Sequence, residues 1–237
     1  MHSFLQALNE GVLTSYGYQT PLLPPTVRYI EQRLDKTVVV VEQPPQVRRV
    51  LWVNDGENPG ISHDEYVERS LAFPFVVLLL SFDGAELDGR QQLYYRRAPL
   101  SSLEDPLLQP NLLNVTPDRD SGACWLCLGK IGPAASWAER IAGAVESFWA
   151  SGFNHDFDVP RGSGFTLLHG LDPRIATASA WEDASRQDSL FPLGIDWPDA
   201  GLCLGDAIGF AYAGEQPAPG LSSLDQVGDI LYRVPQA

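Results

Sequence analysis

Residues 109–157 read QPNLLNVTPDRDSGACWLCLGKIGPAASWAERIAGAVESFWASGFNHDF. The segment begins with a polar loop that contains Pro110, Asn111 and Asn114. A short apolar run at 123–128 follows and contains two of the three cysteines of the chain. An amphipathic stretch then leads to a polar end. A thiol, amide groups and an imidazole therefore lie close together in sequence, in a pattern compatible with thiol catalysis.

The amphipathic stretch is predicted to be a helix. Pro133 and Ser136 are typical of a helix start, and Ser151–Gly152 is typical of a helix end. One face of the helix is apolar at the spacing of a helical repeat; it contains Trp137, Ile141, Val145 and Phe148. The helix is followed directly by Asn154, His155 and Asp156.

Four segments upstream are predicted to be strands. They are the β-branched run 37–41, the segment 47–53, the apolar run 73–82 and the alternating segment 91–97. The run 73–82 is apolar on both faces, which predicts a central, covered strand, and 91–97 is expected to be more exposed. Short connections between the strands favour an antiparallel meander.

A helix is predicted before the first strand, over 26–34, because Thr26 is a good N-cap and apolar residues recur at helical spacing. Pro44–Pro45 predicts a turn between the first two strands, because proline cannot continue a ladder. Residues 57–70 are polar and are interpreted as a partly helical insertion. The last third of the chain has a weaker pattern, with a strand expected at 165–169. Further helical spacing occurs at 178–187 and 224–232.

These patterns predict an α+β fold: a four-strand antiparallel meander with flanking helices on one face. The predicted organisation has an N-terminal segment at 1–25, a core at 26–159 and a C-terminal extension at 160–237 that packs on the core. A 237-residue chain that is 44% hydrophobic is long enough for one such core.

The composition excludes some classes of function. A net charge of −14 argues against nucleic-acid binding, which requires clustered Lys and Arg. The longest apolar run is too short to span a bilayer, and no secretory signal is visible, so no membrane partner is expected. Three cysteines without a framework spacing suit a reducing compartment. The sequence thus predicts a soluble cytoplasmic protein.

The cysteines allow more than one chemistry. Cys124 and Cys127 form a C-x-x-C pair, but bulky spacers and a strand-like context do not favour a redox dithiol, and a zinc site lacks further ligands. Cys127 lies where the strand gives way to a loop, as an exposed nucleophile requires, although a buried structural thiol is the common alternative. Cys124 and Cys203 are expected in the core. Neither a metal nor an organic cofactor is implied.

The polar residues around Cys127 also have two interpretations each. Asn111 or Asn114 could donate an amide N–H to a developing oxyanion, or each could cap the loop. His155 could polarise a nucleophile or hold an incoming amine, or it could be a capping or surface histidine at a helix end. The residues alone leave these alternatives open.

In their order, these motifs resemble the ubiquitin-conjugating enzyme superfamily. In its eukaryotic members, a His-Pro-Asn triplet precedes a strand that ends in G-x-x-C-L. Here Gln109-Pro110-Asn111 stands in the place of the triplet, and Cys127-Leu128 matches the Cys-Leu pair. The spacing between Asn111 and Cys127 is longer than in the eukaryotic pattern, which leaves Asn114 as a rival to Asn111.

The likeness is closer to a prokaryotic branch of that superfamily. Its members are encoded in ubiquitin-like conjugation operons and in the ParB-related, ThiF-related cassette. The segments VVVVEQPPQVRRVLW, RRAPLSSLEDPLLQPNLLNV, CLG and FWASGFNH are similar to that branch. The resemblance covers residues 26–157.

This resemblance implies that Cys127 carries a ubiquitin-like protein as a thioester. The modifier would be received from a ThiF-like activating enzyme, and a JAB-type peptidase would be a further partner. It also implies that the first helix docks the activating enzyme, with Arg28 and Arg33 as contacts. Two alternatives stay open: a catalytically inactive module that binds a ubiquitin-like protein or the activating enzyme, and an unrelated thiol enzyme that uses Cys127 with His155.

Overall fold

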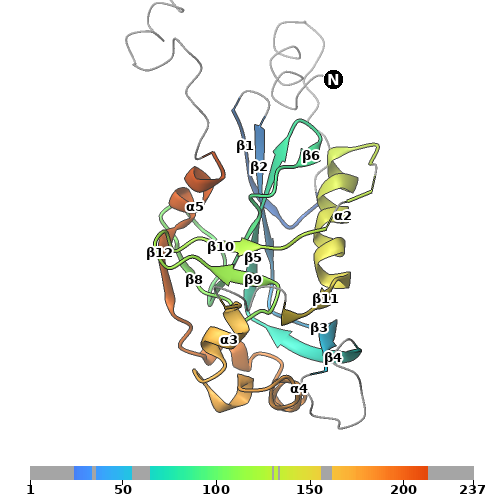
Figure 1. The fold of residues 1–237 in the computed structure, drawn as a ribbon. Helices are drawn as coiled ribbons and strands as arrows, with labels where there is room; N and C mark the ends of the chain where they lie inside the picture. The colour runs from blue at the N-terminus through green and yellow to red at the C-terminus, as the bar shows by residue number, and fades with distance from the viewer. Residues whose placement is uncertain are drawn as a thin grey trace, which may run out of the picture.

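The computed structural model of the chain describes residues 24–33, 36–54, 65–129, 131–132, 134–155 and 162–212. It has the predicted α+β class, with a largely antiparallel sheet and a few helices (Figure 1). The strands are β1 (Val27–Arg33), β2 (Lys36–Gln43), β3 (Gln46–Val53), β4 (Tyr66–Phe73), β5 (Phe75–Asp83), β6 (Glu86–Leu87), β7 (Gln92–Arg96), β8 (Pro106–Leu108), β9 (Val115–Pro117), β10 (Cys124–Leu126), β11 (Gly152–Phe153) and β12 (Asp199–Cys203). The helices are α2 (Trp137–Ala150), α3 (Gly164–Leu168), α4 (Ala178–Gln187) and α5 (Leu204–Ala211), with 3₁₀ turns η2 (Pro173–Ile175) and η3 (Phe191–Gly194).

One long hairpin runs through both sheets of the protein. Its first arm is β2 followed by β3, and its second arm is β4 followed by β5. Gln43 pairs with Val76 on one side of the junction and Gln46 pairs with Phe73 on the other, so the register is the same in both halves. The junctions contain three prolines, which cannot donate to the ladder. The hairpin therefore bends there without changing its pairing.

The bend separates the hairpin into two sheets. Strands β2 and β5 join the main sheet, whose order is β1-β2-β5-β7-β10-β9, and β3 and β4 join β11 in a second sheet. The predicted four-strand meander is therefore wrong in one strand, because 47–53 belongs to the second sheet. Pro44–Pro45 causes a bend inside a continuing arm, not the predicted turn. Residues 66–70, interpreted as part of a helical insertion, are in strand β4.

The predicted helix over 26–34 is also wrong, because 27–33 is strand β1. Its apolar spacing fits either structure, and the neighbouring chain decides between them. Strand β2 is fully buried along its eight residues and has one side occupied by β5. β1 pairs with the other side of β2, antiparallel, from Val27 opposite Val41 to Arg33 opposite Lys36. Pairing with an adjacent, strongly β-forming segment thus overrides a weak helical preference.

The main sheet is covered on both faces, whereas helices were expected on one. In Figure 1, α2 lies on one side of this sheet and α5 on the other. Phe82 contacts Trp137 of α2 with ring centroids 5.3 Å apart. Gln92 donates from Nε2 to the Ala207 carbonyl of α5 at 3.0 Å. As a result, all five residues of β7 are buried, and the prediction of an exposed strand at 91–97 is wrong.

Helix α2 confirms the prediction of a helix that starts after Ser136 and ends before Ser151. The Ser136 hydroxyl accepts from the Glu139 N–H at 3.2 Å, and the Glu139 carboxylate accepts from the Ala135 N–H at 2.8 Å. These two bonds satisfy N–H groups that the helix itself cannot. Strand β11 follows the helix after one residue, Ser151, and pairs in parallel with β3.

Residues 162–212 complete the same core. Helix α4, predicted at 178–187, covers the open edge of β4: the Glu182 carboxylate accepts from the Ser70 N–H at 3.0 Å. The Ser185 hydroxyl accepts from the Ala72 N–H at 2.8 Å. Side chains of a helix thereby satisfy the backbone groups of an edge strand. The strand predicted at 165–169 is instead the short helix α3, and 224–232 lies outside the described residues.

Candidate functional site

Cys127 lies directly after the last residue of β10, and its side chain is exposed. The preceding residue, Leu126, pairs with Val115 of β9. The Cys127 N–H donates to the Asn114 carbonyl at 3.0 Å, which extends the pairing by one residue. The thiol therefore stands at a fixed position on the surface, at the end of a strand, as the sequence predicts for Cys127.

The other two cysteines differ from Cys127 in their surroundings. Cys124 is fully buried, as predicted, and burial raises the pKa of its thiol far above the ordinary value. Its Sγ lies 3.7 Å from the Gly122 carbonyl oxygen. Cys203 is half-buried at the start of α5, where its thiol donates to the Asp206 carboxylate at 3.0 Å. The C-x-x-C pair thus consists of one inert buried thiol and one exposed thiol.

Asn114 joins Cys127 to the end of helix α2. Its amide Nδ2 donates to the Ser151 hydroxyl at 3.0 Å and to the Gly152 carbonyl at 3.2 Å. Its Oδ1 accepts from the Asn154 N–H at 3.2 Å. Both amide hydrogens are thereby used to hold the chain after α2. These bonds make Asn114 a structural link between the thiol and the polar end of the helix.

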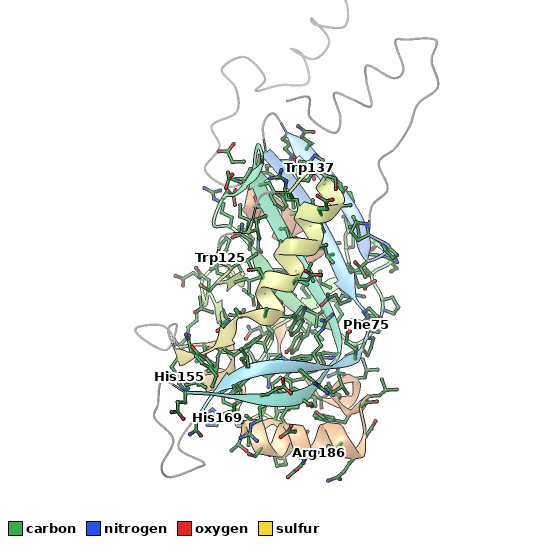
Figure 2. All side chains as sticks on the ribbon, turned by 90° about the vertical axis from the view of Figure 1, so that its right-hand side faces the viewer. Phe75, Trp125, Trp137, His155, His169 and Arg186 are labelled. Atoms are coloured by element: carbon green, nitrogen blue, oxygen red, sulfur yellow. The ribbon has the colours of Figure 1, made fainter. Side chains whose placement is uncertain are left out.

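The segment 151–155 is held against the end of β4. A Cβ atom on Gly152 would lie 2.4 Å from the Tyr66 ring, so only glycine allows the ring to pack there. The Tyr66 hydroxyl accepts from Asn154 Nδ2 at 3.1 Å. His155 follows and is exposed; Figure 2 shows it beside the end of the second sheet.

Asn111 lies in a different environment from Asn114. Its side chain is fully buried, and neither its Nδ2 nor its Oδ1 has a hydrogen-bond partner. The start of helix α3 packs against this loop: a Cβ on Gly164 would lie 2.1 Å from the Pro110 carbonyl oxygen. The Leu112 carbonyl accepts a hydrogen bond from the Phe165 N–H at 3.2 Å, which holds α3 against the loop. In this conformation the Asn111 amide is shielded from solvent.

Hydrogen bonds therefore link Cys127, Asn114 and the segment 151–154, which His155 follows, whereas the Asn111 side chain is buried and takes no part in these bonds. Sequence reasoning missed Tyr66, which comes from a strand far away in the chain. The available signal was Gly152, which was interpreted only as a helix stop. A glycine at that position also indicates a close approach by another side chain.

A surface cavity of about 450 Å³ lies elsewhere, between α3, β12 and the turn at 117–122. Cys127 is not among its lining residues, which are Gln109, Pro117, Asp118, Arg119, Asp120, Ser121, Gly122, Leu167, Ala200 and Gly201. Among the described residues, no three His, Cys, Asp or Glu side chains are grouped so that they could hold a metal ion. Within the same ranges, no helix has the length and apolar character needed to cross a bilayer.

Alkylation of the native protein with iodoacetamide is expected to modify Cys127 and to spare Cys124. The first thiol is exposed, whereas the second is buried and stays protonated because its pKa is raised. Raising the pH from 7 to 9 should leave Cys124 unmodified, and unfolding in guanidinium should expose it. Peptide mass spectrometry measures both sites in one sample. Rapid native labelling of Cys124 would contradict the described burial.

Asn114→Ala is expected to destabilise the protein by about 1–3 kcal/mol, because three hydrogen bonds to half-buried partners are lost, each worth roughly 0.5–1.5 kcal/mol. The Gly152 carbonyl and the Asn154 N–H both lose a partner in this variant. Urea unfolding followed by tryptophan fluorescence measures the change. Ser151→Ala is the matched control, because it removes only the hydroxyl from the same cluster and should cost less. Equal stabilities of the two variants would argue against the central place of Asn114.

Comparison with family models, curated proteins and solved structures finds no match to this chain.

Proposed function

We propose that this protein carries an acyl group on Cys127 as a thioester and transfers it to an amine. The observation that carries the proposal is the exposure of Cys127 at a strand end that is fixed to the polar segment after α2 through Asn114. A thioester carrier needs an accessible sulfur on a rigid support, with polar groups beside it to receive the acceptor. The buried Cys124 lacks that access.

The first step is an exchange of thioesters. The Cys127 thiolate attacks the acyl carbon of the donor, a new carbon–sulfur bond forms, and the carbon–sulfur bond of the donor breaks. The donor sulfur leaves as a thiolate and takes up the proton that Cys127 lost. Attack by a thiolate on a thioester needs little acid catalysis, because the leaving group is itself stable.

The second step is aminolysis. A neutral amine attacks the acyl carbon and forms a tetrahedral intermediate, which collapses by expelling the Cys127 thiolate. The nitrogen loses a proton to solvent or to a nearby base and becomes an amide. His155 is an exposed imidazole directly after the segment that Asn114 holds, and it is the candidate group to orient the amine or accept that proton.

The class of acyl group comes from the sequence resemblance. The Pro-Asn loop, the Cys127-Leu128 pair and the polar helix end are similar to the prokaryotic branch of ubiquitin-conjugating enzymes. On that basis the acyl group is the C-terminus of a ubiquitin-like protein, and the donor is a ThiF-like activating enzyme. The α+β fold with an antiparallel sheet is compatible with this assignment.

A non-reducing gel tests the proposal. The protein is incubated with an activating enzyme of the ThiF class, ATP and the ubiquitin-like modifier encoded with it. A slower band that disappears with dithiothreitol is the expected result. No band, together with normal alkylation of Cys127, would contradict the carrier function, because the thiol would then be accessible but not used.

A second candidate function is non-covalent binding of a ubiquitin-like protein. The observation that favours it is the exposed apolar character of β3, where Val47 is 45% and Leu51 is 40% exposed. Val47 and Leu51 lie on the same face of β3, with the exposed Arg49 between them, and exposed apolar side chains flanked by charged ones are common in protein contact surfaces. Cys127 would then be dispensable. Val47→Asp combined with Leu51→Asp should abolish binding of the modifier in this case, and Cys127→Ala should leave the binding constant unchanged.

A further inference from the structure

Tyr66 stands out because it is a large, 43% exposed aromatic residue that nevertheless makes two specific contacts. Its ring packs on Gly152, and its hydroxyl accepts from Asn154 Nδ2 at 3.1 Å. Tyr66 is the first residue of β4, opposite Val53, the last residue of β3. It therefore lies at the far end of the long hairpin and connects that end to the segment after α2.

The contacts of Tyr66 continue to the thiol in two further steps. Asn154 donates its backbone N–H to Asn114 Oδ1 at 3.2 Å. Asn114 in turn accepts the Cys127 N–H on its own carbonyl at 3.0 Å. Asn154 is thus held from two sides, by Tyr66 through its side chain and by Asn114 through its backbone. Strand β4 and strand β10 are linked in this way across residues from four separate parts of the chain.

Gly152 and Tyr66 form a matched pair. A Cβ atom at position 152 would lie 2.4, 2.5 and 2.9 Å from three atoms of the tyrosine ring and hydroxyl. Such distances are below any van der Waals contact, so a side chain at 152 would displace the ring. The Gly152 carbonyl also accepts a hydrogen bond from Asn114 Nδ2 at 3.2 Å. The position of the ring and the position of the polar segment are therefore coupled.

From these contacts we infer that Tyr66 is a positioning residue for transfer from Cys127, acting through Asn154. The inference rests on the proposed thioester function. Tyr66 touches neither the acyl carbon nor the amine; it holds the segment 151–155, which the proposed function places beside the incoming amine. Its effect is therefore expected on the rate of transfer at saturating amine and not on the amine concentration that gives half the limiting rate.

The test uses single-turnover discharge of the purified thioester to free lysine. Tyr66→Phe keeps the ring on Gly152 and removes only the acceptor of the Asn154 bond. Its limiting rate should fall by about two- to tenfold, the factor that a lost hydrogen bond of ordinary strength represents. Tyr66→Ala and Gly152→Ala should fall further, because each also removes the ring contact. Glu68→Gln, at an exposed position two residues further along β4, should discharge at the wild-type rate.

A second measurement separates this inference from the proposed function. Amide hydrogen exchange of residues 150–155 should be faster in Tyr66→Phe than in the wild type, with β2 and β5 unaffected. Wild-type exchange or a wild-type limiting rate in this variant would overturn the positioning role. If the wild type forms no thioester at all, the proposed function fails and the transfer role falls with it. Exchange then still reports whether Tyr66 holds the segment.

Discussion

Cys127→Ser is expected to replace the dithiothreitol-sensitive adduct by an ester that survives thiol reductant and is cleaved by alkali. A serine hydroxyl at the same exposed position can accept the acyl group, but an alkoxide is a much poorer leaving group than a thiolate. The ester should therefore accumulate and should not discharge to lysine. Cys127→Ala should form no adduct of either kind. Denaturing gels with and without reductant, followed by alkaline treatment, distinguish the three species.

Cys203→Ala is the matched control for this series. Cys203 is a half-buried thiol paired with Asp206 at the start of α5, and the proposed chemistry does not use it. The Cys203→Ala variant should accept the acyl group and transfer it to lysine at the wild-type rates. An adduct that persists in Cys127→Ala and disappears in Cys203→Ala would show that Cys203, and not Cys127, is the reactive cysteine. That outcome would contradict the proposal directly.

Trp181→Ala is expected to lower the free energy of unfolding by about 3–5 kcal/mol, the range for removing a buried large aromatic side chain. Trp181 is fully buried and lies edge-on to Trp52 and Phe73, at centroid distances of 6.2 and 5.3 Å. Its Nε1 also donates to the Ala72 carbonyl on the edge of β4 at 2.9 Å. The substitution thus creates a cavity and leaves an edge carbonyl without its partner. Chemical unfolding followed by circular dichroism measures the loss.

Leu190→Ala serves as the control, because Leu190 is 53% exposed and should change stability by less than about 0.5 kcal/mol. Comparing the two variants tests whether the region after residue 160, which is predicted from the sequence as an extension, unfolds together with the core. If α4 were a loosely attached addition, Trp181→Ala would unfold it locally and leave the main transition intact. A single cooperative transition at lower denaturant is the expected result, since Trp181 packs on residues of β3 and β4.

The elements predicted correctly from the sequence are those whose pattern is both strong and local. The β-branched run of β2, the apolar run of β5 and the capped amphipathic helix α2 each have one structural solution. The same holds for Cys127, because the end of an apolar run followed by glycine predicts a strand end at the surface. Local patterns therefore predicted the class of the fold and the exposure of the thiol.

The errors come from pairings between distant segments. Residues 27–33 have a pattern that fits a helix or a strand. They form a strand because they pair with the edge of β2 that β5 leaves open. The proline pair at 44–45 predicts an interruption, but whether the chain turns or bends depends on the partner arm. The contact between Tyr66 and Gly152 joins residues more than eighty positions apart, so no periodicity reports it. Long-range packing overrides local preference at each of these places.

The unbroken pairing of the bent hairpin also limits how the length of this protein can change. Pairs run in one register from Lys36 opposite Asp83 to Val53 opposite Tyr66. Deleting a single residue from either arm would shift every pair beyond it and exchange the two faces of the strand. Tyr66 would then leave Gly152. The length of each arm is therefore expected to be fixed, because any change within it breaks this register.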